Sequence, residues 1–227
     1  MSTCWKWDFH HNEIMDTIFH VYNRGVEKRK IYIDDCDYKR FIFSLGLFNS
    51  QSPTNPNAHR TTPMMEVPLP SLGFTTEENL VEIMAFCLMP NHYHLMIRPK
   101  IERGLTMFMR KLGTGYTNYF NLRYKRVGSL FQGIYKQKPV TTDSHFNWLP
   151  HYIHCNPFVG SGTSNIYTEY PWSSYGEYAG EAKYPDIVDT SFLSSWFESS
   201  ENFKRETSEW LNSEKQSSDL HDLAMSE

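Results

Sequence analysis

The sequence has little cysteine and no long apolar run, and these absences exclude several classes of protein. The four cysteines, Cys4, Cys36, Cys87 and Cys155, are widely separated and form no C-x-x-C pair, so neither a disulfide framework nor a cysteine zinc site is expected. No uninterrupted apolar stretch is long enough to span a bilayer. The first residues also lack a basic segment followed by an apolar one. We therefore expect a cytoplasmic protein without a membrane partner.

Charge is unevenly distributed along the chain, whose formal net charge is -4. Residues 1–166 hold 18 Lys and Arg against 13 Asp and Glu, whereas residues 167–227 hold 4 against 13. Within 100–138, nine basic residues accompany one acidic residue, Glu102. A local positive field suits a polyanion such as nucleic acid, although charge alone also fits an ordinary solvated helix face.

With 227 residues, 40% of them apolar and 15% aromatic, the chain is long and apolar enough to bury a core. We expect residues 1–15 to form a flexible arm and residues 16–160 to form the main domain. A loop excursion at 49–78 is rich in Pro, Asn, Ser and Thr. Residues 161–227 form an acidic C-terminal extension, which we expect to be partly docked and disordered at its end.

Apolar periodicity predicts strands at 16–23, 81–88, 92–98 and within 127–140, and helices at 37–48, 101–125 and 145–155. Short helices are expected within 189–211. The order strand, helix, strand, strand, helix, strand, helix predicts an α+β fold. It is a ferredoxin-like split β-α-β arrangement on one antiparallel sheet, with helices on one or both faces.

Three residues carry local predictions about the backbone. Gly25 follows the first strand and is expected to turn the chain with a positive φ. Pro90 marks the turn between the second and third strands, because it cannot donate to a ladder. Pro150 removes a hydrogen bond from the last helix and is expected to kink or restart it.

The stretch His92-Tyr93-His94 follows directly on the apolar run 81–89 and its turn. On a strand, His92 and His94 point to one side, about 6 to 7 Å apart. Neutral imidazole is the commonest metal ligand in proteins, so the pair is a candidate metal site. The competing interpretation is a surface strand that carries two histidines by chance, since two ligands do not complete a site.

A second candidate cluster lies in the last predicted helix of the domain. Tyr152 and Asn156 are four residues apart and share a helix face. An amide oxygen is a hard ligand of the kind that Mg²⁺ or Mn²⁺ accepts, and a tyrosine beside a metal-bound phosphate can act as a nucleophile. The competing interpretation is a core or surface tyrosine, because the chain contains 14 of them.

Five motifs occur in one order along the chain, and together they resemble the single-tyrosine HUH transposases, in particular the REP-associated tyrosine transposase branch of the IS200-like family. The motifs are Phe19-His20-Val21-Tyr22-Asn23-Arg24-Gly25, His92-Tyr93-His94, Gly128-Ser129-Leu130-Phe131-Gln132-Gly133, Tyr152-Ile153-His154-Cys155-Asn156-Pro157 and Pro171-Trp172-Ser173-Ser174-Tyr175. The resemblance implies an HUH endonuclease-type catalytic domain. In such a domain His92, His94 and Asn156 bind Mg²⁺ or Mn²⁺ and Tyr152 attacks DNA.

The resemblance further implies a substrate and a cellular location. The enzyme would cleave and rejoin single-stranded DNA near hairpin-forming repeats through a 5′-phosphotyrosine, as a monomer or a homodimer in the cytoplasm with the chromosome. His151 and His154 flank the tyrosine and are candidates for a supporting role. The predicted DNA-binding residues are Arg24, Lys28, Arg29, Lys30, Arg103, Arg110, Lys111, Arg123, Lys125, Arg126 and Lys136.

Two other classes of function compete with this interpretation. One is a non-catalytic DNA-binding protein that keeps the fold and the hairpin or single-strand binding. The other is a metal-dependent hydrolase that uses activated water, with Tyr152 in a structural role. Tyr116 and Tyr119 are the rival nucleophiles, but their helical spacing fits core packing better.

Overall fold

The structure, a computed structural model, describes residues 17–53, 78–158, 168–181 and 183–216. The predicted arm at 1–15, most of the predicted excursion at 49–78 and the far end of the predicted extension at 161–227 lie outside the described residues.

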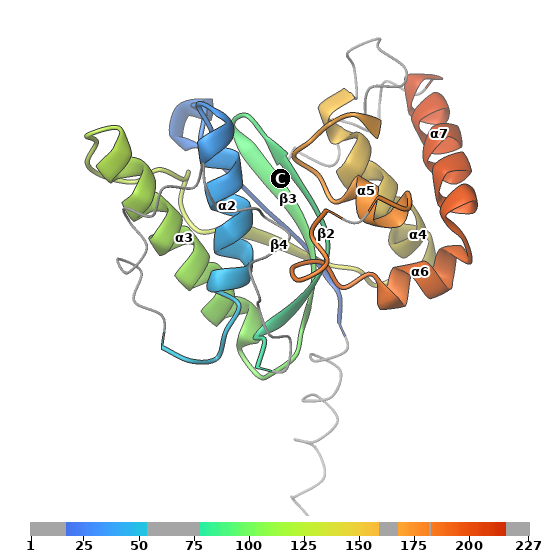
Figure 1. Ribbon diagram of the computed structural model, residues 1–227, viewed down its shortest axis with the longest axis horizontal. Helices are drawn as coiled ribbons and strands as arrows, with labels where there is room; N and C mark the ends of the chain where they lie inside the picture. Colours follow the sequence, from blue (N-terminus) through green and yellow to red (C-terminus); the bar gives the residue numbers. More distant parts are fainter. Residues whose placement is uncertain (1–16, 54–77, 159–167, 182, 217–227) are drawn as a thin grey trace, which may run out of the picture.

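One four-stranded antiparallel sheet forms the centre of the molecule (Figure 1). Its strands are β1 (Phe19–Arg24), β2 (Val81–Met89), β3 (His92–Pro99) and β4 (Lys136–Pro139), and their order across the sheet is β2-β3-β1-β4. All three neighbouring pairs run antiparallel. The predicted α+β fold with a split β-α-β sheet is therefore confirmed.

Helices cover both faces of this sheet (Figure 1). One face carries α2 (Asp35–Leu47) and α3 (Gly104–Arg123), and the other carries α4 (Asp143–Cys155). Outside α4 lie the C-terminal helices α5 (Tyr175–Tyr178), α6 (Ser191–Phe197) and α7 (Ser200–Gln216); the 3-10 turns are η1 (Val26–Lys28) and η3 (Asn156–Phe158). Among the described helices, none is long and apolar enough to cross a membrane.

The side chains of β3 alternate between the two layers of helices. Tyr93 is buried and its ring centroid lies 5.1 Å from that of Phe41 in α2. His94 points the other way, and its ring centroid lies 5.6 Å from that of Tyr152 in α4. The strand periodicity predicted for His92-Tyr93-His94 thus places an aromatic ring in the core and the imidazoles beneath α4.

The positive φ predicted for Gly25 was wrong. Gly25 has a φ of -63°, and the positive φ values fall on Glu27 and Lys28. Glycine is needed at position 25 for a close approach instead, because a Cβ there would lie 2.4 Å from the carbonyl oxygen of Arg29. Pro150 lies inside α4, which continues as one helix from Asp143 to Cys155, so the predicted restart does not occur and the predicted kink stays a prediction.

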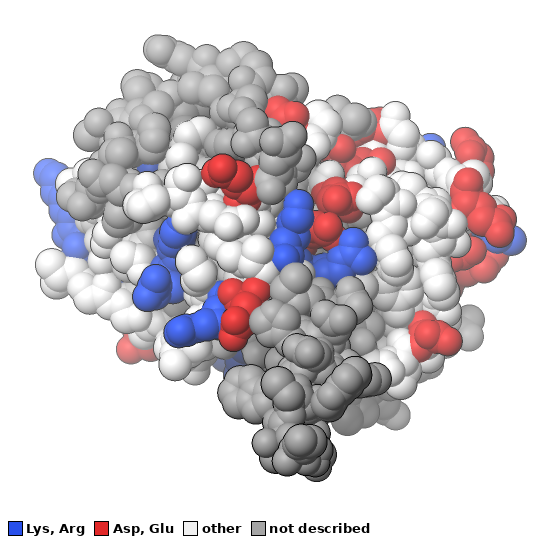
Figure 2. Space-filling model, turned by 90° about the horizontal axis from the view of Figure 1, so that it is seen from below, with Lys and Arg blue, Asp and Glu red and all other residues white. Residues whose placement is uncertain are grey.

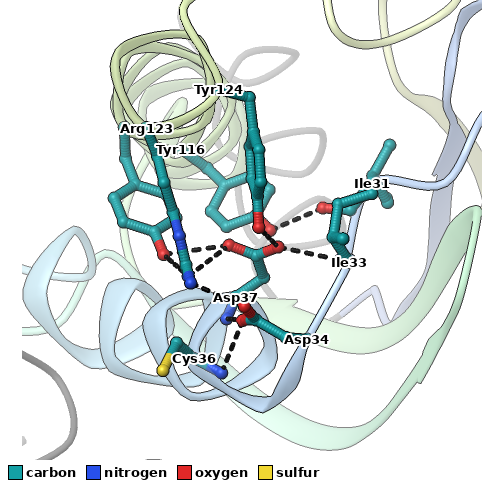
Figure 3. Close-up of polar contacts among 9 residues, drawn as sticks. Ile31, Ile33, Asp34, Cys36, Asp37, Tyr116, Arg123 and Tyr124 are labelled. Carbon is teal, nitrogen blue, oxygen red and sulfur yellow. Dashed lines mark hydrogen bonds and ion pairs between the residues drawn. The ribbon is translucent and has the colours of Figure 1, made fainter.

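Asp37 joins α2 to α3 and to the chain before α2 (Figure 3). Its buried carboxylate accepts hydrogen bonds from the Tyr119 hydroxyl (2.9 Å), the Arg123 Nη1 (2.9 Å), the Tyr124 hydroxyl (2.7 Å) and the backbone N–H of Ile33 (2.8 Å). Four donors replace the water that this carboxylate loses on folding, so removal of the carboxylate leaves buried donors unsatisfied.

We expect Asp37→Ala to lower the free energy of unfolding by about 3–5 kcal/mol, because it leaves a cation and two hydroxyls without their shared acceptor. Urea denaturation measures the change. Asp35→Ala removes an exposed carboxylate from the same helix turn and should cost under about 1 kcal/mol. Equal losses in the two variants would contradict the assigned role of Asp37.

Candidate active site

The candidate site lies where β3 faces α4. His92 and His94 project from β3, and their ring centroids are 5.1 Å apart. Asn156 directly follows α4, and its Oδ1 lies 3.4 Å from the Nε2 of His92. The ring of Tyr152, one helical turn earlier, contacts the ring of His94. The structure therefore brings together all four residues that the sequence singled out.

The turn before β3 orients His92. Asn91 Oδ1 accepts a hydrogen bond from the Nδ1–H of His92 over 2.6 Å. The turn itself is held by the loop after β1, because Gly25 donates its N–H to Asn91 O and Ile31 donates its N–H to Pro90 O. The hydrogen bond to Asn91 fixes the ring of His92, whose Nε2 faces Asn156.

His20 of β1 is a third imidazole in the site. Its Nε2 lies 2.8 Å from Nδ1 of His94, and both rings are buried. Burial, with smaller contributions from the positive charge of Lys138 and from His145, lowers the pKa of His20 to about 3. His20 is therefore neutral near pH 7, and a neutral ring can accept the Nδ1–H of His94, which directs the other nitrogen of His94 away from β1.

Tyr152 lies in a mostly aromatic pocket. Its ring centroid is 5.8 Å from that of His20, 5.3 Å from that of Trp148 and 6.3 Å from that of Trp210. Trp148, Tyr152 and Asn156 follow one another at four-residue steps, so α4 presents them along one face. Trp210 comes from α7, which makes the C-terminal extension part of the wall around the phenol.

The donor atoms fit a hard divalent cation. The Nε2 of His92 lies 3.4 Å from the Oδ1 of Asn156, so an imidazole nitrogen and an amide oxygen meet in the site. Two imidazoles with an amide oxygen form a donor set that suits Mn²⁺ or Mg²⁺. Within 17–53, 78–158, 168–181 and 183–216, no group of three or more His, Cys, Asp and Glu side chains could hold a metal.

Basic residues border the site on the sheet itself. Arg24 lies opposite His92 in the β1–β3 register, and Lys136 and Lys138 of β4 lie opposite Tyr22 and His20. Directly opposed residues share a face of the sheet, and the Tyr22 ring stacks on His94. Arg24 and Lys136 were predicted DNA-binding residues, whereas Lys138 was counted only as part of the basic segment.

The other predicted DNA-binding residues lie on α3, next to its ends, or in the loop after β1. Those of α3 are separated from Tyr152 by the sheet, because α3 covers the opposite face (Figure 1). Several are also engaged within the protein: Arg123 binds Asp34 and Asp37, and Lys111 donates to two backbone carbonyls. The remaining residues are Lys28, Arg29 and Lys30 in the loop after β1, Arg103 and Arg110 at the start of α3, and Lys125 and Arg126 after its end.

Seen from below, acidic side chains gather at the edge where α7 lies, and basic side chains lie over the rest of this face together with some acidic ones (Figure 2).

His151 and His154 turn away from Tyr152. His151 Nδ1 lies 2.8 Å from Thr207 Oγ1 in α7, and His154 Nε2 lies 2.9 Å from Ser174 Oγ. Burial lowers the pKa of His151 to about 4 and that of His154 to about 3. Through these contacts both histidines attach the C-terminal segment to α4, and their supporting role beside Tyr152 stays a prediction.

The motif around Trp172 also supports the sheet. Leu88 donates its N–H to the carbonyl of Trp172, and Ser174 donates its N–H to the carbonyl of Phe86. Residues 172–174 therefore lie along the outer edge of β2. The Ser174 hydroxyl accepts from the N–H of Phe86 and contacts His154.

Residues 66–156 match the family model described as Transposase IS200 like. This span is less than half of the 227 residues, and it includes His92, His94, Tyr152 and Asn156. The resemblance to IS200-like transposases predicted from the sequence is confirmed over these residues. β1 with His20, and the C-terminal helices with Trp210, lie outside the match.

A search of the curated proteins found no match. Among solved structures, a REP-associated tyrosine transposase bound to a REP hairpin is similar to this chain, with a TM-score of 0.49 and 14% sequence identity. The likeness covers 84% of this chain and 94% of the other. A likeness this low carries no argument about ligand or activity.

His20, Trp148 and Trp210 were missed as site residues. The signal for His20 was present in the sequence, because His20 and Tyr22 alternate along β1 as His92 and His94 do along β3. His20 can be assigned to the site only once the pairing of β1 with β3 is known, and the sequence alone does not give that pairing. Trp148 precedes Tyr152 by four residues on one helix face, whereas nothing in the sequence places Trp210 beside Tyr152.

We expect His151 to make stability depend on pH. The unfolded chain takes up a proton on His151 near its ordinary pKa of 6.5, but the folded protein does so only near 4. The contribution of this residue to the free energy of unfolding is therefore complete above pH 6.5 and falls between pH 6.5 and 4.

Urea denaturation between pH 7.5 and 4.5 measures this dependence. His151→Gln should lessen the fall in unfolding free energy over that interval by roughly 1–3 kcal/mol. Asn147→Ala, at an exposed position of the same helix, should follow the parent protein. Parallel pH profiles for His151→Gln and the parent would show that the ring is not buried in neutral form.

Proposed function

We propose that this protein is a metal-dependent transesterase that cleaves and rejoins single-stranded DNA near hairpins, with Tyr152 as nucleophile. One observation carries the proposal. His92 and His94 on β3 meet Tyr152 of α4 and Asn156 at its end in one site, with His92 Nε2 only 3.4 Å from Asn156 Oδ1. The match to the IS200-like family model spans the same four residues, which supports transposase chemistry over other metal-dependent reactions.

The Tyr152 hydroxyl would attack a phosphodiester of the strand. The Oη–P bond forms as the bond from phosphorus to the 3′ oxygen breaks, and the phenolic proton leaves while the 3′ oxygen gains one. The products are a 5′-phosphotyrosine and a free 3′-hydroxyl. Because one phosphoester replaces another, the step needs no external energy source and can reverse to rejoin strands.

His92, His94 and Asn156 would hold the Mg²⁺ or Mn²⁺ ion. When bound, such an ion neutralises charge on the phosphate in the transition state. Asn91 and His20 would orient these ligands, because Asn91 is hydrogen-bonded to Nδ1 of His92 and His20 to Nδ1 of His94. Such contacts set the tautomer and orientation of the imidazoles before any ion arrives.

The strand would approach along Arg24, Lys136 and Lys138, which share the histidine face of the sheet. Phosphate contacts of this kind position a strand without reading its sequence. The basic residues of α3 lie across the sheet, so they would contact a second part of the nucleic acid, such as the hairpin stem, rather than the scissile phosphate.

The rival tyrosines lie in the core between α2 and α3. Tyr116 donates its hydroxyl hydrogen to the carbonyl of Ile31, and Tyr119 donates to Asp37. Burial raises the pKa of both phenols above the ordinary value of 10. Neither hydroxyl is directed toward the histidine pair, which leaves Tyr152 as the candidate nucleophile.

We expect Tyr152→Phe to abolish covalent attachment to DNA while leaving strand binding within about threefold, because only the attacking oxygen is removed. The measurement incubates protein, Mn²⁺ and end-labelled hairpin-bearing single strands, followed by denaturing electrophoresis. Adduct formation should fall on the order of 10³-fold or more.

Tyr119→Phe is the matched control, and it should retain the adduct. Cleavage that persists in Tyr152→Phe without an adduct would instead identify a hydrolase that uses water. Strand binding without cleavage in the parent protein, across varied hairpins and both metal ions, would identify a non-catalytic binding protein.

We also expect the metal site to be measurable without activity. His92→Ala should abolish calorimetric Mn²⁺ binding, and Asn91→Ala should weaken it by roughly tenfold, because it removes only the hydrogen bond that orients the ring. His145→Ala removes an imidazole outside the ligand set and should bind Mn²⁺ like the parent. Unchanged binding in His92→Ala would refute the ligand assignment.

A further inference from the structure

We propose that a cleft beside Tyr152, formed by α4, α6 and α7, binds one unpaired base of the strand and favours guanine. This inference rests on the proposed function, because it names a determinant of the substrate of that site. The cleft has a volume of about 550 Å³ and is lined by Asn147, Trp148, His151, Trp196, Glu206, Glu209, Trp210 and Ser213.

The cleft adjoins the proposed nucleophile through two of its walls. The ring centroids of Trp148 and Trp210 lie 5.3 and 6.3 Å from that of Tyr152. A nucleotide next to a phosphate at Tyr152 therefore has a base-sized recess within reach. The third wall, Trp196, leaves 46% of its surface exposed and packs one edge on Phe146.

Three indoles in one cleft favour a flat aromatic ligand. Stacking of a base on an aromatic side chain is worth about 1–3 kcal/mol and is available to every base. Partly exposed tryptophans are unusual on a protein surface that serves no binding role. Stacking alone would bind any base, so selectivity has to come from the polar residues of the cleft.

Those polar residues include two carboxylates. Glu206 is partly exposed and lies 3.7 Å from Arg205, and Glu209 is exposed. His151 is neutral near pH 7 because burial lowers its pKa to about 4, so it does not compensate their charge. The carboxylates disfavour phosphate in the cleft, which keeps the backbone of the strand on the side of Arg24 and Lys138.

Carboxylates only accept hydrogen bonds. Guanine presents two adjacent donors on its Watson–Crick edge, the ring N1–H and the 2-amino group, and these match the two oxygens of one carboxylate. Adenine and cytosine each pair an amino group with a ring acceptor, which would face the carboxylate lone pairs unfavourably. The chemistry therefore ranks guanine above adenine and cytosine.

The test measures strand binding in the Tyr152→Phe background, so that it does not depend on cleavage. Each guanine of a hairpin-bearing strand's single-stranded flank is replaced in turn by inosine, which lacks the 2-amino group. At one position inosine should weaken binding roughly tenfold, the value of one lost hydrogen bond to a charged group.

Glu209→Gln should remove this penalty and raise the affinity for adenine at that position, because glutamine both donates and accepts. Trp196→Ala should weaken binding of every base there. Glu201→Gln removes a carboxylate from the first turn of α7, outside the cleft, and should preserve the guanine preference.

The inference would be overturned if the effect of inosine on binding were the same in Glu209→Gln and Trp196→Ala as in the parent. It would also be overturned if the carboxylates of the cleft bound the polyamine spermidine while strand binding showed no preference among bases. Failure of the proposed function looks different. If guanine is preferred through Glu209 but Tyr152 never forms an adduct, the role of Tyr152 as nucleophile is refuted and base binding in the cleft is supported. If an adduct forms without any base preference, the role of Tyr152 is supported and base binding in the cleft is refuted.

Discussion

The antiparallel pairing of β1 with β3 is the interaction on which the site depends. Its register sets Tyr22 opposite His94 and Arg24 opposite His92, so one face of two strands carries the imidazoles, a stacking ring and a cation. A shift of one residue would exchange this face for the apolar one that packs on α2 and α3. Burial of Val21 and Tyr93 in the core thus protects the alignment of the site as well as the stability of the sheet.

Burial also decides the charge state of the site. His20 loses its water shell beneath α4, and its pKa falls to about 3. A histidine kept neutral offers a lone pair, which is the form that binds a metal or accepts a hydrogen bond from a second imidazole. The same aromatic surroundings that bury Tyr152 therefore keep His20 neutral as a hydrogen-bond partner of His94.

Local periodicity predicted much of this arrangement. The two-residue period of His92 and His94 and the four-residue period of Tyr152 and Asn156 correctly assigned each pair to one side of its element. Periodicity carries no information about distant neighbours, so His20 was missed although it lies 2.8 Å from His94. Nor does periodicity show on which face of the sheet a helix packs. The positive charge of α3 suggested a DNA-binding surface beside the site, but α3 and the site lie on opposite faces of the sheet.

The structure gives the C-terminal extension a role that its sequence did not indicate. From sequence, residues 161–227 form an acidic segment beyond the main domain. In the structure, α7 packs on α4 through Thr207 and His151 and brings Trp210 to Tyr152. For the proposed single-stranded DNA substrate, the acidic residues of α7 would disfavour phosphate beside the site, whereas Arg24 of β1 and Lys136 and Lys138 of β4 would attract it. Together these two charged surfaces would restrict the path of a strand through the site, which neither surface could do alone.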